Sequence, residues 1–186
     1  MPMNRIFHWF YCMPLSRAVI WILLAATLFL LLRSKLGEKT YWKAGVLLLF
    51  ICWLFVIYFG TLGYRTEDSN LLEPVLIPFY SYYTALNGGS EEIYRSNFMN
   101  IALFFPAGLL GCDLLPKRWR PFFSVLLVTG LFMLISIGIE YIQFQFSMGL
   151  AEVDDVIHNS LGVLLGGVFC RVSIKTSSTK NIGAVK

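Results

Sequence analysis

Five apolar stretches follow one another along the chain, and polar loops separate them. They cover residues 18–32, 44–62, 98–111 with an extension to Leu115, 121–146 and 156–170. A helix that crosses a bilayer needs about 20 residues, so the first and last stretches are short. Their flanking polar residues must therefore reach the interface or face the bundle. The pattern predicts an all-α fold, a polytopic membrane helix bundle of about five transmembrane helices.

The composition agrees with this pattern and excludes other classes of protein. The chain has 186 residues, of which 57% are hydrophobic and 14% are charged, whereas a soluble domain carries about 25% charged residues. Disorder requires low hydrophobicity and is excluded. A nucleic-acid binder is excluded as well, because the net charge is only +4 and the basic residues lie between apolar stretches.

Four scattered cysteines without CxxC spacing predict free thiols: Cys12, Cys52, Cys112 and Cys170.

The distribution of Lys and Arg predicts the orientation of the bundle. With a cytoplasmic C-terminus, 11 of the 15 Lys and Arg residues lie on the cytoplasmic side, and the outer side holds Arg5, Arg17, Arg65 and Arg95. The first stretch ends in Leu31-Leu32-Arg33 instead of in small residues, so we predict a retained anchor and not a cleaved signal peptide. If it does not span, four helices remain and their placement is unchanged.

The predicted organisation is one domain with four parts. Residues 1–62 hold two N-terminal transmembrane helices, 63–97 form an outer loop, 98–172 form a three-helix core, and 173–186 form a polar cytoplasmic tail. Pro74 and Pro78 break the outer loop, and Tyr residues follow them. Since Tyr favours the membrane interface, we expect this loop to lie along the outer surface or to re-enter under protein cover.

Polar side chains occur at the ends of the last three apolar stretches, where a membrane span should not contain them. Consecutive spans run in opposite directions, so the start of the third stretch, the end of the fourth and the start of the fifth share one membrane face. The charge distribution predicts that this face is outside. The expected members of this outer polar pocket are Asn100, Glu140, Gln143, Asp154, Asp155, His158 and Asn159.

The spacing of these residues predicts close helix packing beside the pocket. Asp155 and Asn159 are four residues apart, and Gly162 and Gly166 continue the same helical stripe. Small residues at this spacing let two helices approach closely. Glu140 is the strongest marker of the pocket, because an acid at the centre of a span costs about 2.5–3.5 kcal/mol on insertion scales. Glu140 lies off-centre in its stretch, so its own cost should be lower.

Simpler roles compete with ligand binding at several of these positions. Asp154 is equally suited to cap its own helix, and Asn100 and Asn159 to bond neighbouring helices. His158 and the nearby acids would form a poor zinc site, because zinc sites typically have more nitrogen or sulfur ligands. We predict no metal and no cofactor. Ser147 and Ser160 have no base partner in the sequence pattern, so no catalytic residue is predicted.

Three motifs together resemble the VanZ-like family. They are N-x(3)-F-x-P-x-G from Asn100 to Gly108, E-x-x-Q from Glu140 to Gln143, and D-D-x(3)-N-x-x-G from Asp154 to Gly162. The segment Ile77-Pro78-Phe79 and the order of the motifs also match, and the resemblance covers residues 64–170. Carried over by position, the motif residues are Asn100, Pro106, Gly108, Glu140, Gln143, Asp155, Asn159 and Gly162. Many members carry a basic residue shortly before the acidic pair, but residues 147–151 contain none.

The resemblance implies a function in the bacterial cell envelope. The named member of the family is associated with teicoplanin resistance and has little effect on vancomycin. We therefore expect a non-enzymatic, multi-pass protein of the bacterial cytoplasmic membrane, whose outer pocket lowers sensitivity to lipoglycopeptides. The alternatives are an intramembrane enzyme acting on a lipid-linked cell-wall precursor, or a small transporter. Expected partners are membrane lipids and a lipoglycopeptide or such a precursor, and no nucleic acid.

Overall fold

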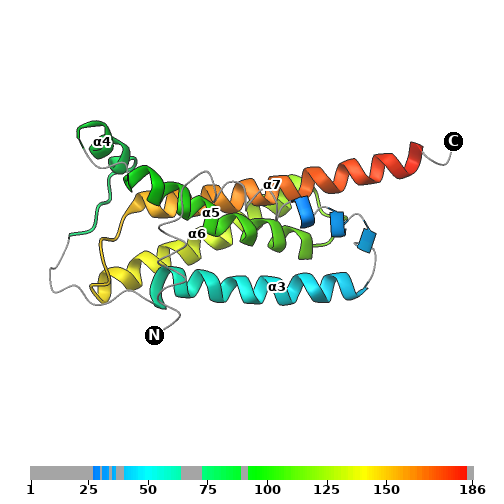
Figure 1. Cartoon of the computed structure of the whole chain (residues 1–186), viewed down its shortest axis with the longest axis horizontal. Helices are drawn as coiled ribbons and strands as arrows, with labels where there is room; N and C mark the ends of the chain where they lie inside the picture. The colour runs from blue at the N-terminus through cyan, green and yellow to red at the C-terminus, as the bar shows by residue number, and fades with distance from the viewer. Residues whose placement is uncertain are drawn as a thin grey trace.

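A computed structural model of the chain describes residues 27–29, 31–33, 35–36, 40–63, 73–88 and 92–183. The described residues up to 36 are helical, and a π-helical turn, η1 (Phe59–Gly63), ends the first long helix. The helices are α3 (Thr40–Tyr58), α4 (Tyr80–Leu86), α5 (Glu92–Leu114), α6 (Pro121–Gln145) and α7 (Val153–Gly183). The all-α prediction is confirmed (Figure 1).

Within the described residues, four helices are long and apolar enough to cross a membrane. They cover Tyr41–Gly63, Ile93–Leu114, Pro121–Gln145 and Val153–Ser173. Only 17% of the first of these is buried in the bundle and 33% of the third, so most of their apolar surface is left for lipid. The predicted membrane bundle is confirmed, while the number five is approximate, because the first predicted span, 18–32, falls largely outside the described residues.

Two helices extend beyond their apolar stretches. α5 begins at Glu92, within the predicted outer loop, and the backbone of α7 continues to Gly183, through the predicted polar tail. A second part of that loop is also helical, namely α4. The physical reason is that an apolar stretch marks only the lipid-embedded part of a helix, and polar residues can continue the helix into the interface.

The long helices alternate in direction, so each end of the bundle collects a defined set of segments (Figure 1). We call the end where α5 and α7 begin and α6 ends the polar end; η1 and α4 lie there too. We call the end where α5 stops and α6 begins the basic end, after Lys117, Arg118 and Arg120 in the connecting turn. This is the antiparallel arrangement on which the predicted pocket depends.

α5 and α7 lie side by side with their backbones in direct contact. A Cβ atom added at Gly166 would lie 2.0 Å from the Phe105 carbonyl oxygen. At Gly162 it would lie 2.4 Å from the Ile101 carbonyl oxygen. On the other helix, a Cβ at Gly108 would lie 2.0 Å from the carbonyl oxygen of Val163. The glycine stripe seen in the sequence therefore lies in this interface, where only hydrogen fits.

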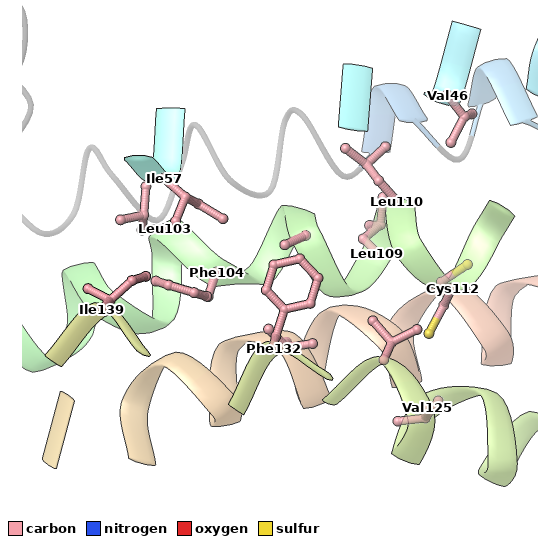
Figure 2. Packing of buried hydrophobic residues seen from close by; sticks show 14 residues of the cluster. Val46, Ile57, Leu103, Phe104, Leu109, Leu110, Cys112, Val125, Phe132 and Ile139 are labelled. Carbon is pink, nitrogen blue, oxygen red and sulfur yellow. The ribbon is translucent and has the colours of Figure 1, made fainter. Parts of the chain in front are cut away.

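Mostly aliphatic side chains form the core around α5, and two of its aromatic rings, Phe104 and Phe132, lie side by side in it (Figure 2). Phe104 of α5 is completely buried and meets the edge of Phe132 of α6, with ring centroids 6.3 Å apart. Phe132 also meets Phe50 of α3, at 6.1 Å. This chain of rings joins three helices into one core, in an arrangement favoured by the charge distribution of aromatic rings.

Pro106 lies inside α5 without ending it. A proline has no N–H, so the carbonyl oxygen four residues earlier loses its helical partner. One residue further, the indole N–H of Trp53 in α3 donates to the Leu103 carbonyl oxygen at 2.8 Å. A side chain of α3 thus bonds the α5 backbone beside the proline.

Candidate functional site

The seven predicted site residues come together at the polar end, as the antiparallel arrangement requires. Asn100 lies on α5, two lie on α6 and four on α7. Asn100 and Asp155 are half-buried. The other side chains are buried, with exposures between 1% and 8%: Glu140, Gln143, Asp154, His158 and Asn159. The cluster is therefore largely internal, and the Asn100–Asp155 side is its accessible edge.

Asp154 holds the start of α4. Its carboxylate accepts hydrogen bonds from the backbone N–H groups of Phe79 and Ser81, the second at 2.8 Å, and from the Ser81 hydroxyl. Asn97 of α5 donates to the same hydroxyl oxygen at 3.0 Å. Asp154 thus acts as a helix cap, but for α4 instead of its own helix. The first N–H groups of a helix lack partners in the helix itself, and a carboxylate satisfies them.

His158 extends the contact between α7 and α4. Its Nε2 atom lies 2.8 Å from the hydroxyl oxygen of Tyr82, and the two ring centroids are 5.6 Å apart. A phenol can both donate and accept, so this contact fits either tautomer of the imidazole. His158 Nδ1 has no partner among the described residues and is buried. The ring of Tyr82 also meets Tyr94 of α5 edge-on, at 6.0 Å.

Glu140 stabilises the start of α7 from the last turns of α6. Its carboxylate accepts a hydrogen bond from the backbone N–H of Glu152 at 3.0 Å. Glu152 also forms an isolated parallel bridge with Val75. The N–H of Val75 donates to the Ala151 carbonyl oxygen at 2.9 Å, and the N–H of Val153 donates to the carbonyl oxygen of Val75 at 3.0 Å. Part of the outer loop is therefore fixed along the entry to α7.

Two buried amides bond neighbouring segments. Gln143 donates to the carbonyl oxygen of Thr61 in η1 at 2.9 Å, and Asn159 donates to the Ser136 hydroxyl on α6 at 2.9 Å. The amide oxygens of Gln143 and Asn159 have no hydrogen-bond partner in the described part of the chain. Asn159 thus joins α6 and α7, which is the interhelical role weighed for it from the sequence.

Asp155 and Asn100 form the accessible pair. The Asn100 amide donates to the Asp155 carboxylate at 2.7 Å, across the α5–α7 interface. Both are half-buried, so they can meet a ligand from outside the bundle. Among the described residues, no three His, Cys, Asp or Glu side chains converge to hold a metal ion. The arrangement can present a carboxylate and an amide to a polar group.

Sequence reasoning missed several partners of these residues. Ser81 and Tyr82 lie in the outer loop, whose position the sequence pattern could not give. Thr61 and Ser136 are single hydroxyl residues in apolar stretches, and nothing in their spacing marks them. Asp113 could have been identified as a buried polar residue from the sequence, since it is an acid at the end of an apolar stretch.

Asp113 organises a second buried polar group at the basic end. Arg33 forms an ion pair with its carboxylate, and the Trp42 indole N–H donates to the other oxygen at 2.9 Å. Arg171 of α7 is also buried there. These contacts fasten residues 31–33 and the start of α3 to the end of α5.

The chain is similar to proteins of one known family. The model of the VanZ/LLP1 family matches residues 45–174. Protein VanZ of Enterococcus faecium is 31% identical over 93 residues, which are 50% of this chain and 54% of that protein. The chain thus aligns with about half the length of this relative. No solved structure matches. The matched family region contains α5, α6, the part of α7 up to residue 174 and all seven residues of the polar cluster.

Proposed function

This chain belongs to the VanZ/LLP1 family, and from that premise we propose that it lowers the sensitivity of a bacterium to lipoglycopeptide antibiotics such as teicoplanin. It does so from the cytoplasmic membrane, as a multi-pass protein with its polar end outward and its C-terminus in the cytoplasm. The excess of Lys and Arg at the basic end supports this orientation. The protein binds its ligand and does not transform it.

The proposal rests on the half-buried Asp155–Asn100 pair together with exposed apolar side chains of the outer loop. Asp155 and Asn100 offer a carboxylate and an amide at the end of the membrane span. In residues 77–86 of the outer loop, which include α4, the side chains of Ile77, Tyr83 and Leu86 are exposed. A ligand with a polar part and a hydrocarbon chain matches both surfaces, since the chain can lie along the apolar residues while the polar part bonds the pair.

The remaining cluster residues position this surface. Asp154 holds α4 and Glu140 holds the start of α7, each by accepting backbone hydrogen bonds. These contacts give both acids positioning roles, which favours binding over the two alternatives, an enzyme acting on a lipid-linked cell-wall precursor and a small transporter. We propose that Asp155 and Asn100 contact the ligand directly, whereas Gln143, His158 and Asn159 are buried and support the surrounding helices.

The test is drug susceptibility of a sensitive Gram-positive host that expresses the full chain. The variants are Asp155→Asn and Glu140→Gln, which remove a charge but keep an oxygen acceptor for Asn100 and for the Glu152 N–H. Glu73→Gln is the matched control, because Glu73 is exposed at the same end of the bundle. Membrane levels are matched by immunoblot.

We expect wild type and Glu73→Gln to protect against teicoplanin and not against vancomycin, and both cluster variants to lose most of the protection. Protection that persists in Asp155→Asn and Glu140→Gln would exclude the polar cluster. A changed set of lipid-linked precursors in extracts of the expressing cells would favour the enzyme instead.

A further inference from the structure

A surface hollow lies at the basic end, far from the polar cluster. Its volume is about 570 Å³, and Trp119, Arg120, Phe122 and Phe123 line it. These residues span the last part of the α5–α6 turn and the first turn of α6. Because the apolar span of α6 begins at Pro121, the hollow lies at the depth where lipid headgroups meet the hydrocarbon of the bilayer.

The wall of the hollow is aromatic and exposed. Phe122 is 75% exposed and Phe123 is 54% exposed. Trp119 packs edge-on against Phe123 with ring centroids 5.6 Å apart, which keeps both rings in place. Aromatic rings at this depth contact the glycerol region and the upper acyl chains of lipids. An apolar surface of this kind fits a lipid better than a soluble ion.

The charge around the hollow is positive. Lys117, Arg118 and Arg120 occur within four positions, and no acidic residue lies between Asp113 and Glu140 in the sequence. The first turn of α6 has no acidic residue, and the N-cap residue Arg120 makes no side-chain cap hydrogen bond. The amino end of a helix carries partial positive charge, which adds to that of the arginine. An anionic headgroup beside Arg120 would match this charge.

We propose that this hollow binds one anionic glycerophospholipid of the surrounding leaflet. Its phosphate lies at Arg120 and the amino end of α6, and its acyl chains run along Phe122 and Phe123. Basic surfaces of membrane proteins on the cytoplasmic side attract anionic headgroups in this way. The hollow lies at the basic end, opposite to the polar cluster. Lipid binding there does not depend on the proposed function in antibiotic resistance.

The experiment measures lipid that stays bound to the purified full chain in detergent, by native mass spectrometry. The probes are phosphatidylglycerol, phosphatidylcholine of the same acyl chains, and inorganic phosphate as a competitor. Arg120→Gln is the test variant. Lys43→Gln is the matched control, because Lys43 is exposed in the first turn of α3, at the same end but outside the hollow. Phe123→Ala tests the aromatic wall, and thermal unfolding checks that each variant is folded.

We expect phosphatidylglycerol to be retained in preference to phosphatidylcholine. Arg120→Gln should reduce this retention about fivefold, which corresponds to the ~1 kcal/mol that a basic residue contributes at an anionic surface. Phe123→Ala should also reduce it, and Lys43→Gln should not. Equal retention of the two lipids, or equal losses in Arg120→Gln and Lys43→Gln, would overturn the proposal. Displacement of the lipid by inorganic phosphate would also overturn it, as the site would then bind a free anion.

Discussion

Three acidic side chains inside the bundle, Asp113, Glu140 and Asp154, accept hydrogen bonds from groups on other segments of the chain. An unpaired carboxylate in a membrane span is costly. The Arg33 cation offsets this cost at Asp113, and backbone N–H groups offset it at Glu140 and Asp154. Asp113 and Asp154 therefore join parts of the protein that are more than 70 positions apart in the sequence, and Glu140 joins the end of α6 to the start of α7.

Replacing Asp154 by alanine should release α4 from the bundle. The N–H groups of Phe79 and Ser81 would lose their acceptor, and a lost buried hydrogen bond costs about 1–3 kcal/mol, or roughly a 5- to 150-fold change in a local opening equilibrium. Hydrogen exchange of the Ser81 amide should accelerate by this factor. Asp155→Asn is the control and should leave that amide protected; equal exchange in both variants would show that Asp154 does not hold α4.

Replacing Asp113 by asparagine should destabilise the whole protein. The substitution leaves the buried Arg33 without its counter-charge, and breaking a buried ion pair costs about 3–5 kcal/mol. The thermal unfolding temperature in detergent should fall markedly. The double variant Arg33→Met, Asp113→Asn should be more stable than the sum of the two single losses predicts. Strict additivity of the two losses would mean that the pair contributes no coupling.

At the scale of elements, the contact between α5 and α7 depends on glycine. The two helices bring backbone against backbone at Gly108, Gly162 and Gly166. The glycines of α6 differ: a Cβ at Gly130 or Gly138 would meet no atom within 4 Å. Glycine is therefore a requirement of one interface and not a general property of these helices.

Gly166→Ala should push α5 and α7 apart. The new methyl group would lie 2.0 Å from the carbonyl oxygen of Phe105, a backbone atom that cannot turn away. Overpacking of this kind costs about 1–3 kcal/mol, so the unfolding temperature in detergent should fall. Gly138→Ala should be neutral or slightly stabilising, since alanine has the higher helix propensity. If both variants unfold at the same temperature, the contact is not tight.

At the scale of the whole molecule, the two ends of the bundle differ in charge. The polar end carries the buried carboxylates and amides of α6 and α7, together with α4. The basic end carries Arg118 and Arg120 in the α5–α6 turn, beside the buried Arg33 and Arg171. Cytoplasmic loops of membrane proteins are rich in Lys and Arg, so the asymmetry predicts that the basic end lies on the cytoplasmic side.

Cysteine labelling of whole cells should show this orientation. Glu73 and Arg118 are both exposed and lie at opposite ends of the bundle. We expect a membrane-impermeant thiol reagent to label Glu73→Cys in intact cells, and Arg118→Cys only after the cells are lysed. Labelling of the unsubstituted chain, which contains four cysteines, gives the background. The opposite pattern would reverse the orientation and place the polar cluster in the cytoplasm.

The sequence alone determined the membrane bundle, its alternating directions and the end at which polar residues gather. These features follow from local properties: an apolar stretch long enough for a bilayer must span it, and consecutive spans must run in opposite directions. The spacing of Gly162 and Gly166 marked a close-packing face for the same reason, because a helix places residues four apart on one side.

Only the tertiary structure decided which group each polar side chain contacts. Asp154 caps α4 and not its own helix, and Gln143 bonds the backbone of η1. Asp113 pairs with Arg33, although 80 residues separate them. Helical periodicity gives the face on which a side chain lies but not what stands opposite, and that depends on how the helices and the outer loop pack in space. The partners of the buried polar groups are therefore a property of the folded bundle.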